Sequence, residues 1–404
     1  MARHYRAPRM RRYIPRRTKI AVGITALAVI VIGLIVAGFL KGWISVPRWP
    51  WEEEPTVTVP TQPSPDTVIH LVAGGDVNIT DRVIAGGGSG RDYSGTLLDV
   101  LPVLSGADLS ILNFEGNVYG SADSASAPEQ LLRDLYRGGV DVLQTANSHS
   151  ITNGLLGLAA TNNAIRNAGM QPLGTYASEA EFEQYRGYLI YEIQGIKIAL
   201  VAFTKGMDGR NLPEGNEHCV NLLYTDYSST YKEVNEDGIT DVIRQAQKEE
   251  PDLVIALLHW GGEYNDQISG TQKQIVRLMK KLGVDALIGT HSHHVQQMGF
   301  QDQGEMFVAY SLGDFMGDAE TVNTGYGVLL DLQITKDGPS GAVRISGYEY
   351  VPIYQHYRED GTLELLRIRE AMAAYENNYI GRVSEEVYNA MKTALARIEA
   401  RVKG

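Results

Sequence analysis

Six short apolar stretches of the sequence are each followed at once by polar or ionisable side chains. These side chains are Asp76, Asn113, Glu115, Asn147, His149, His259, His291, His293 and Asp314. Carboxylate oxygens and imidazole nitrogens together are ligands that suit Zn, Mn and Fe. A single His at the end of a strand is most often a hydrogen-bonded structural residue. A group of this composition instead predicts a divalent metal site, because a shared carboxylate, an amide and several His are what two adjacent, water-activating ions require.

The apolar stretches have the length and β-branched composition of buried strands, and helical patterns separate them. An α/β fold is therefore expected, with the polar residues gathered where the strands end. On a strand, residues two positions apart face the same side, so His291 and His293 are expected to share a site and His294 to point away. Two later runs, 325–335 and 342–354, alternate like antiparallel strands and are expected to close a second sheet.

The first 40 residues carry the signals of a membrane anchor. Residues 1–19 hold eight basic side chains and no acidic one, and residues 20–40 form an apolar run long enough to cross a bilayer. The basic flank keeps the N-terminus in the cytoplasm by the positive-inside rule. A cleaved signal peptide is the alternative, but the apolar run is long and no small-x-small cleavage site follows it. The sequence thus predicts a single-pass plasma-membrane protein whose main domain is extracytoplasmic.

Three further segments follow the predicted span. Residues 41–66 are rich in Pro and Thr and are expected to form an extended stalk. Residues 67–355 are expected to form the domain that holds the polar cluster. Residues 356–404 are predicted as C-terminal helices that pack on this domain.

The charge of the chain is divided between these segments. The formal net charge of the 404 residues is −12, and since residues 1–19 carry +8, the rest carries −20. Nucleic acid is excluded as a partner, because phosphate backbones need a clustered basic surface. The one cysteine, Cys219, excludes a disulfide framework and a Cys-based zinc cluster.

The order of the motifs resembles the CapA/PgsA family of bacterial capsule (poly-γ-glutamate) synthesis proteins, which carry the PGA_cap domain. The resemblance covers residues 68–354, and its most specific motifs are LHWGGEY at 258–264 and YSLGDF at 310–315. The family looks like a branch of the calcineurin-like metallophosphoesterases. The resemblance therefore implies an α-β-β-α sandwich, divalent metal of the Mn, Zn or Fe type, and a membrane anchor.

The resemblance also implies a role for each polar residue. Asp76 matches the first metal-binding Asp of the catalytic site, and Glu115 matches the bridging carboxylate. The three His ligands correspond to His259, His291 and His293, and the His that protonates the leaving group corresponds to His149. Contacts to substrate are expected from Arg82, Asn113, Trp260, Glu263, Tyr264 and Asp314. For Trp260 and Tyr264, packing within the domain is an equal alternative.

The chain departs from the family pattern at three positions. Ser148 stands where the family has its ligating Asn, so that Asn147 would have to serve as the amide ligand after a small shift. Thr152 replaces an Asp three residues after His149, and Asp314 replaces an Asn. The departures leave the second metal site open, whereas the first retains its ligands.

Two functions are consistent with these features. The first is a metal-dependent hydrolase or transferase that cleaves a phosphoester or an amide of a cell-envelope polymer. The second is a non-catalytic assembly or export component with a degenerate metal site, and a membrane-tethered sensor is a third possibility. Family resemblance implies membrane-embedded synthetase components and an anionic polymer such as poly-γ-glutamate as partners. A domain of −20 repels a polyanion, so polymer binding requires metal or a local basic groove, for which Arg82, Lys205 and Arg210 are candidates.

Overall fold

The computed structural model describes residues 29–34, 36–38, 40–41, 64–119, 126–301, 304–378 and 383–403. The chain divides into two compact units, Met1–Gln62 and Pro63–Gly404. In the first unit, residues 29–34, 36–38 and 40 are helical. None of the helices in the described part of the chain combines the length and apolar character that a membrane crossing needs. The predicted basic tail, most of the predicted span and nearly all of the predicted stalk lie outside the described residues.

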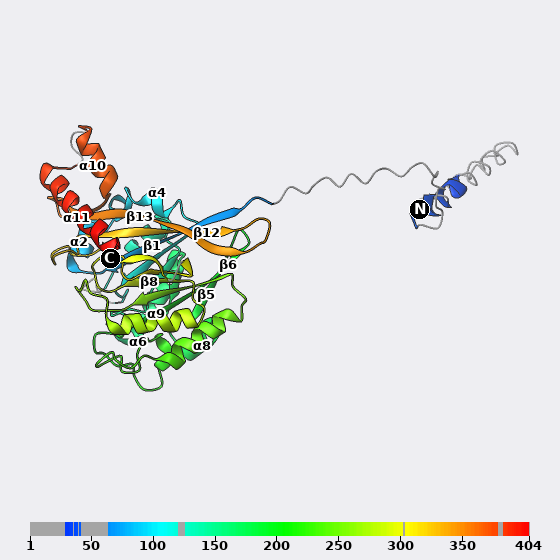
Figure 1. Cartoon of the computed structure of the whole chain (residues 1–404), viewed down its shortest axis with the longest axis horizontal. Coiled ribbons are helices and arrows are strands. Elements are labelled where there is room, and N and C mark those ends of the chain that lie inside the picture. Colours follow the sequence, from blue (N-terminus) through cyan, green and yellow to red (C-terminus); the bar gives the residue numbers. More distant parts are fainter. Residues whose placement is uncertain are drawn as a thin grey trace, which may run out of the picture. The chain divides into compact units, whose positions relative to one another are not determined.

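The second unit is built on two β-sheets (Figure 1). The first sheet has the order β14 (Leu363–Arg367), β13 (Val343–Tyr357), β12 (Tyr326–Lys336), β1 (Thr67–Asn78), β2 (Leu109–Glu115), β3 (Val142–Gln144) and β4 (Gln171–Leu173), and β11 (Asp314–Met316) pairs with β1. The second has the order β5 (Tyr188–Ile193), β6 (Ile196–Thr204), β7 (Leu253–His259), β8 (Ala286–Thr290), β10 (Met306–Ala309) and β9 (Met298–Gln301). The six apolar stretches lie in β1, β2, β3, β7, β8 and β10, so each sheet receives three of them.

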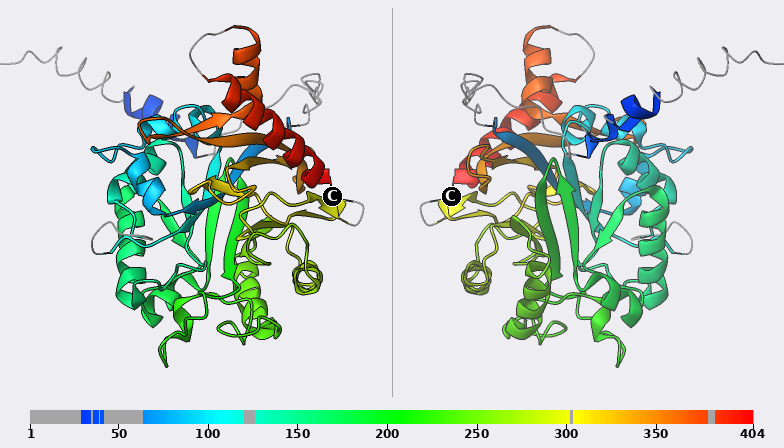
Figure 2. Two further views of the ribbon diagram at one scale, coloured as in Figure 1. Left: turned by 90° about the vertical axis from the view of Figure 1, so that its left-hand side faces the viewer. Right: turned by 90° about the vertical axis from the view of Figure 1, so that its right-hand side faces the viewer.

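Helices cover the outer face of each sheet (Figure 2). The helices described in this unit are α2 (Asp81–Gly86), α3 (Ser94–Leu97), α4 (Leu101–Leu104), α5 (Glu129–Arg137), α6 (Gly154–Ala168), α7 (Glu179–Tyr185), α8 (Glu236–Gln247), α9 (Gly270–Lys281), α10 (Ile368–Glu376) and α11 (Glu385–Lys403). The apolar residues of α5 and α6 pack on the first sheet, and those of α8 and α9 pack on the second. A third apolar cluster fills the space between the sheets. The layers therefore run helix, sheet, sheet, helix.

Alternation along the strands produces these layers. In β1, Leu71 and Ala73 point into the cluster between the sheets, whereas Val72 points outward to the helices of the first sheet. In the same way, Leu200 of β6 faces the inner cluster and Val201 faces α8 and α9. Both faces of these strands are buried, which explains why their sequences are continuous apolar runs.

An Asp at the start of four parallel strands ties each strand to its neighbour. The backbone N–H of each Asp donates to the carbonyl of one residue in the adjacent strand. The carboxylate of the Asp accepts a bond from the backbone N–H of that same neighbouring residue. The pairs are Asp108 with His70, Asp141 with Ser110, Asp252 with Lys197, and Asp285 with Val254. These paired bonds hold the register of the parallel strands, so the carboxyl ends of β1, β2, β7 and β8 reach the same edge of the sandwich.

Two features of the fold differ from the sequence prediction. The runs 325–335 and 342–354 become β12 and β13, but they extend the first sheet through β1 rather than closing a second sheet. One edge of the second sheet is formed by β5, which a hairpin turn joins to β6. The two residues of this turn, Gln194 and Gly195, both have positive φ. Residues 356–404 also contain a strand, β14, before α10 and α11.

Candidate metal centre

The polar cluster lies where strands of both sheets end. Asp76 pairs with Asn113 of β2 on one side and with Asp314 of β11 on the other. Gly75 allows this close approach, because a Cβ at that position would lie 1.7 Å from the carbonyl oxygen of Gly313. The N–H of Asp76 donates to that carbonyl at 3.1 Å. The adjacent ends of β7 and β8 bring in His259 and the segment that starts at His291.

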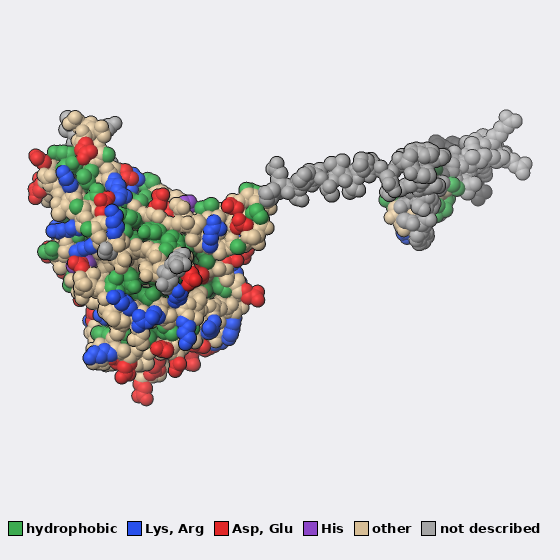
Figure 3. All heavy atoms as spheres, in the orientation of Figure 1, with side chains coloured by type: hydrophobic (Ala, Val, Ile, Leu, Met, Phe, Trp, Pro, Cys, Tyr) green, Lys and Arg blue, Asp and Glu red, His purple; other side chains and the backbone are tan. Residues whose placement is uncertain are grey.

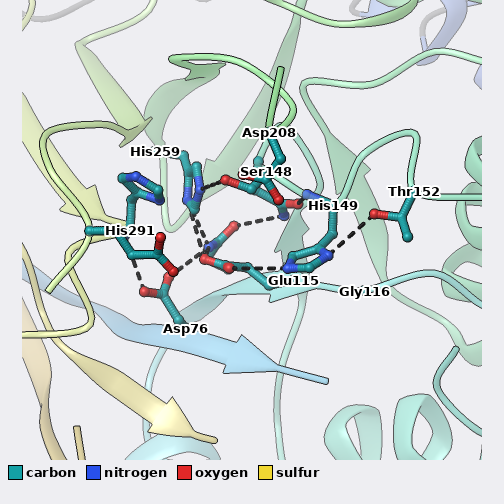
Figure 4. A network of polar contacts seen from close by, with 12 residues as sticks. Asp76, Glu115, Gly116, Ser148, His149, Thr152, Asp208, His259 and His291 are labelled. Atoms are coloured by element: carbon teal, nitrogen blue, oxygen red, sulfur yellow. Dashed lines mark hydrogen bonds and ion pairs between the residues drawn. The ribbon is translucent and has the colours of Figure 1, made fainter. Parts of the chain in front are cut away.

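Asp76, Glu115 and His259 form the centre of the cluster (Figure 4). All three are buried, and one ligand atom of each lies within 4.8 Å of the others. Nδ1 of His259 lies 3.3 Å from Oε1 of Glu115. Asp76, His293 and Asp314 form a second buried group of the same kind, in which Nδ1 of His293 lies 2.7 Å from Oδ1 of Asp314 and 3.5 Å from Oδ2 of Asp76. Asp76 belongs to both groups.

The electrostatics of the cluster favour a bound cation. Burial, followed by the charge of Asp76, raises the pKa of Glu115 well above its usual range. Burial also raises the pKa of Asp314 to about 7, and it lowers the pKa of His259 well below the ordinary value. The carboxylates beside His293 act in the opposite direction on that ring and raise its pKa well above the ordinary value against the effect of burial. Buried carboxylates are costly without positive charge beside them. The donor set of carboxylate oxygens and imidazole nitrogens therefore fits a divalent ion of the Zn, Mn or Fe type.

The side chain of Asn113 lies within the first of these groups. Its Nδ2 is 2.7 Å from Oδ1 of Asp76, 3.0 Å from Oε1 of Glu115 and 3.3 Å from Nδ1 of His259. Its Oδ1 accepts a bond from the amide of Asn147. Asn113 was predicted to contact substrate. The residue is instead buried, and its side chain binds the carboxylates of the cluster.

His149 is the imidazole at the open side of the cluster. It is only partly buried, and its Nε2 lies 3.9 Å from Oε2 of Glu115. Its Nδ1 lies 3.3 Å from the hydroxyl of Thr152, and its backbone N–H donates to Oδ1 of Asn147. Burial lowers the pKa of His149, so the ring is neutral at pH 7. The ring can therefore exchange a proton with a ligand held beside the carboxylates.

Residues 70–319 match the sequence model of the family described as "Bacterial capsule synthesis protein PGA_cap". The chain belongs to this family. It is 27% identical to the capsule biosynthesis protein CapA of Bacillus anthracis over 262 residues, which are 62% of this chain and 59% of that protein. It is 24% identical to the PGA biosynthesis protein CapA of Bacillus subtilis over 247 residues, 59% of this chain and 61% of that one. The chain therefore spans about three fifths of the length of these PGA_cap relatives.

Two solved structures illustrate the low-identity similarity of the fold. The calcineurin-like phosphoesterase YfkN of Bacillus subtilis is 15% identical, has a TM-score of 0.42 and covers 83% of this chain and 99% of its own. A putative 5'-nucleotidase of Staphylococcus aureus is 13% identical, has a TM-score of 0.45 and covers 82% of this chain and 58% of its own.

In this PGA_cap member, Ser148 rather than Asn147 faces the cluster. The amide nitrogen of Asn147 donates to Asn113 and to the carbonyl of Phe114, and its oxygen accepts from the backbone N–H of His149, so the side chain is held by these three bonds. The prediction that Asn147 is a metal ligand is therefore not supported by its position. The hydroxyl of Ser148 lies 3.1 Å from Nε2 of His259. A neutral hydroxyl is a weak metal ligand, so Ser148 is a poor replacement for the ligating amide of a second metal site.

The two histidines after β8 do not lie on a strand. His291 and His293 both have positive φ, at 91° and 56°, and β8 ends one residue before them. His293 joins Asp76 and Asp314, whereas the ring of His291 lies against that of His259, with 4.4 Å between centroids. The alternation argument for a shared face is thus wrong, although both rings reach the cluster. Positive φ at two non-glycine residues is a strained backbone of the kind that collects at functional sites. His294 turns away from the cluster to Asp266 and the carbonyl of Val322.

The loop after β7 places three predicted substrate residues in different ways. Trp260 is wholly buried, donates to the carbonyl of Tyr310 and stacks on the ring of Tyr310, so the prediction that it lines a groove is wrong. Glu263 is half exposed, with Oε1 3.7 Å from Nε2 of His293. Tyr264 is also half exposed and stacks on His293 at 5.1 Å between centroids. Glu263 and Tyr264 thus form a rim over His293.

Arg82 points away from the carboxylate cluster. It donates to the carbonyl of Asp318, pairs with Glu320 and lies 3.9 Å over the ring of Tyr357. It lines a separate cavity of about 890 Å³ next to residues 383–390 of the C-terminal segment. The predicted contact of Arg82 with a substrate at the metal cluster is therefore not supported. Asp314, the replacement for an Asn, binds His293 instead of lining an open surface.

Two further residues support the cluster: the sequence pattern does not indicate Thr290, and it indicates Lys205 only as a candidate for a basic groove. Thr290, the last residue of β8, has its hydroxyl 3.2 Å from Nδ1 of His259. Lys205 directly follows β6 and lies 3.1 Å from Nε2 of His291. The run IKIALVAFT before Lys205 has the same form as the other six apolar stretches, and counting it as a seventh would have placed Lys205 at the site.

Proposed function

We propose that this PGA_cap protein is a membrane-anchored hydrolase that uses one divalent metal ion to cleave a phosphoester or amide bond during synthesis of a cell-envelope polymer. The observation that carries this proposal is the pair of buried groups that share Asp76, one with Glu115 and His259 and the other with His293 and Asp314, beside the partly exposed His149. Buried carboxylates and imidazoles that converge at strand ends, next to one accessible proton-exchanging group, are the requirements of metal-assisted hydrolysis.

The residues that would hold the ion are Asp76, Glu115 and His259, whose ligand atoms lie within 4.8 Å of one another. A divalent ion bound there lowers the pKa of water and stabilises negative charge on an oxygen of the substrate. The chain itself positions the reacting groups. Tyr264 stacks on His293 and limits its rotation, and Thr290 and Ser148 contact the two nitrogens of His259.

His149 is assigned to proton transfer. When the hydroxyl of Thr152 donates to Nδ1, the proton of the neutral ring resides on Nε2, which faces Glu115 and the open side of the cluster. Nε2 can then give this proton to a leaving oxygen or nitrogen. Glu263 and Tyr264 at the rim are the side chains placed to contact the remainder of a substrate.

The membrane anchor and the polymer are parts of the same proposal. The apolar run 20–40 behind a +8 segment supports an extracytoplasmic domain, and the names of the two CapA relatives support a role in capsule or poly-γ-glutamate synthesis. To bind this acidic domain, a polyanion must contact positively charged side chains on its surface. Lys and Arg side chains lie among the acidic ones on the face drawn in Figure 3, so the net charge does not form one uniform acidic surface there.

A non-catalytic assembly role is the second candidate, and one observation favours it. The amide nitrogen of Asn113 already lies between Asp76, Glu115 and His259, so the cluster is satisfied in part without an ion. In that role the site stabilises the fold or holds polymer, and membrane-embedded synthetase components are the partners.

Metal analysis of the full chain, purified in detergent, separates the two roles. The hydrolase is expected to contain one Zn, Mn or Fe per chain, to hydrolyse a phosphodiester such as bis(p-nitrophenyl) phosphate or a γ-glutamyl amide, and to lose both metal and turnover in His259→Ala. A chain without metal or turnover supports the assembly role. The matched control is His218→Ala, which removes a histidine of the surface helix 217–219.

A further inference from the structure

Lys205 reaches the metal cluster from the second sheet. It follows β6, and its backbone N–H donates to the carbonyl of His259 at 2.8 Å, which fixes the start of its side chain beside β7. Its ammonium lies 3.1 Å from Nε2 of His291 and 3.1 Å from the carbonyl of Gly261. The ring of Tyr231 lies 4.6 Å from it on another side. These three contacts therefore fix the position of the ammonium.

In the described part of the chain, Lys205 has no carboxylate in direct contact, and the charges of Glu263 and Asp208 act on it only from beyond ion-pair distance. Among the residues that the structure describes, no carboxylate lies within ion-pair distance of the ammonium, and its partners are an imidazole, a carbonyl and an aromatic face. Charged side chains that are partly buried are ordinarily paired. A fixed, unpaired cation beside a metal cluster therefore has the chemistry of an anion-binding group.

The contact with His291 has a second consequence. An ammonium can only donate, so Nε2 of His291 must accept and the ring hydrogen must lie on Nδ1. Nδ1 of His291 is buried and has no hydrogen-bond partner. In this arrangement Lys205 occupies Nε2 of His291, while Ser148 supplies a hydroxyl in place of an amide beside His259. A lysine therefore stands on the side of the cluster where His291 lies.

We propose that Lys205 takes the place of a second metal ion and binds the phosphate oxygens of the substrate. A single ammonium that is anchored through His259 and His291 holds positive charge at the side of the cluster where His291 lies. A phosphate group bound by Lys205 would lie beside the residues that would hold the metal ion. The inference rests on the proposed function, because it names the chemical class that the hydrolase would bind.

The test uses the full chain in detergent, with inorganic phosphate as the probe. Metal content is measured by mass spectrometry and phosphate affinity by calorimetry, in the native protein, Lys205→Met, Lys205→Arg and Lys197→Met. Lys197 begins the same strand and donates to the carbonyl of Glu249, so Lys197→Met is a matched control at the far end of β6. Thermal unfolding of each variant shows whether it is folded.

The expected result is one metal per chain in all four proteins. Phosphate affinity should fall at least tenfold in Lys205→Met, because one charge-assisted hydrogen bond is lost. It should be largely retained in Lys205→Arg and unchanged in Lys197→Met. Two metals in the native chain, or equal phosphate affinity in native and Lys205→Met proteins, would overturn the proposal.

Two further arms separate this inference from the proposed function. Phosphate titration is repeated after chelation: a loss of affinity in Lys205→Met that persists without metal supports the role of Lys205 even if no hydrolysis is found. A γ-glutamyl peptide is then titrated in place of phosphate. If Lys205→Met weakens binding of the peptide but not of phosphate, the ligand class is a carboxylate and the proposal is wrong.

Discussion

The amide nitrogen of Asn113 donates a 2.7 Å hydrogen bond to the carboxylate of Asp76 at the centre of the buried cluster. The same nitrogen is 3.0 Å from Glu115, so a single neutral side chain bridges two buried acids. A cation and this amide compete for the same oxygens. The state of the cluster therefore depends on which of them is present.

Replacing Asn113 should destabilise the protein only when metal is absent. In chelator, Asn113→Ala leaves two buried carboxylates without this donor, and the free energy of unfolding should fall by about 1–3 kcal/mol. In saturating Zn or Mn, the ion takes over both oxygens and the loss should be smaller. Urea unfolding with and without metal measures the difference. An equal loss in the two conditions would show that no ion reaches these carboxylates.

Thr152 should influence turnover through His149. Its hydroxyl lies 3.3 Å from Nδ1 and sets which nitrogen carries the proton. Thr152→Val removes that contact at nearly equal volume, and turnover should fall about tenfold at unchanged metal content, an effect typical of a residue that orients a functional His. Thr152→Ser should restore most of the activity, since it keeps the hydroxyl. Wild-type turnover in Thr152→Val would show that Thr152 does not orient His149 for proton transfer.

The end of α11 is joined to the metal cluster through Asp266. One oxygen of Asp266 lies 2.7 Å from Nδ1 of His294, next to His293, and the other accepts from Arg401 at 2.9 Å. Asp266→Ala leaves the buried His294 without this partner and should lower the free energy of unfolding by about 1–2 kcal/mol. Arg401→Ala should cost less, because the ion pair it removes is partly exposed. Chemical denaturation of both variants checks this order, and the reverse order would argue that α11 rather than His294 depends on Asp266.

Asp285 should make the protein less stable as pH rises. Burial raises the pKa of its carboxyl in the folded protein, while the carboxylate accepts the N–H of Val254. A folded-state pKa above the unfolded value means that the folded protein binds more protons, so stability falls as pH rises above about 4. Asp285→Asn keeps an acceptor and removes the charge. Its unfolding free energy should exceed that of the native protein at pH 7 and lose this advantage near pH 4; a constant difference across this range would contradict the prediction.

Local sequence patterns were sufficient to place most of the cluster. Asp76, Glu115, His149, His259 and His293 each follow an apolar stretch, and parallel strands bring such residues to one edge. The α/β class followed from the same pattern, because continuous apolar runs are typical of strands that are buried on both faces.

The remaining errors concern side-chain direction and long-range pairing. Arg82 lies close to Asp76 in sequence, but α2 carries it to Asp318 and Tyr357. Trp260 follows a ligand directly, yet its indole N–H finds the carbonyl of Tyr310 in the core. The strands β12 and β1 pair through residues that are more than 250 positions apart in the sequence. The alternation of apolar and polar residues within one strand cannot predict such a pairing. Lys205 was predicted in a basic groove for polymer but not at the metal cluster, because its strand ends without an acid or a His.

The central claim is that His149 transfers a proton at a metal-bearing cluster, and turnover at matched metal content tests it most directly. Hydrolysis of bis(p-nitrophenyl) phosphate is measured for the native chain and His149→Ala after both are loaded to the same metal content. The account predicts turnover by the native chain and a loss of about 10²-fold or more in His149→Ala. Equal turnover in the two proteins, or none in a native chain that holds its metal, would contradict it.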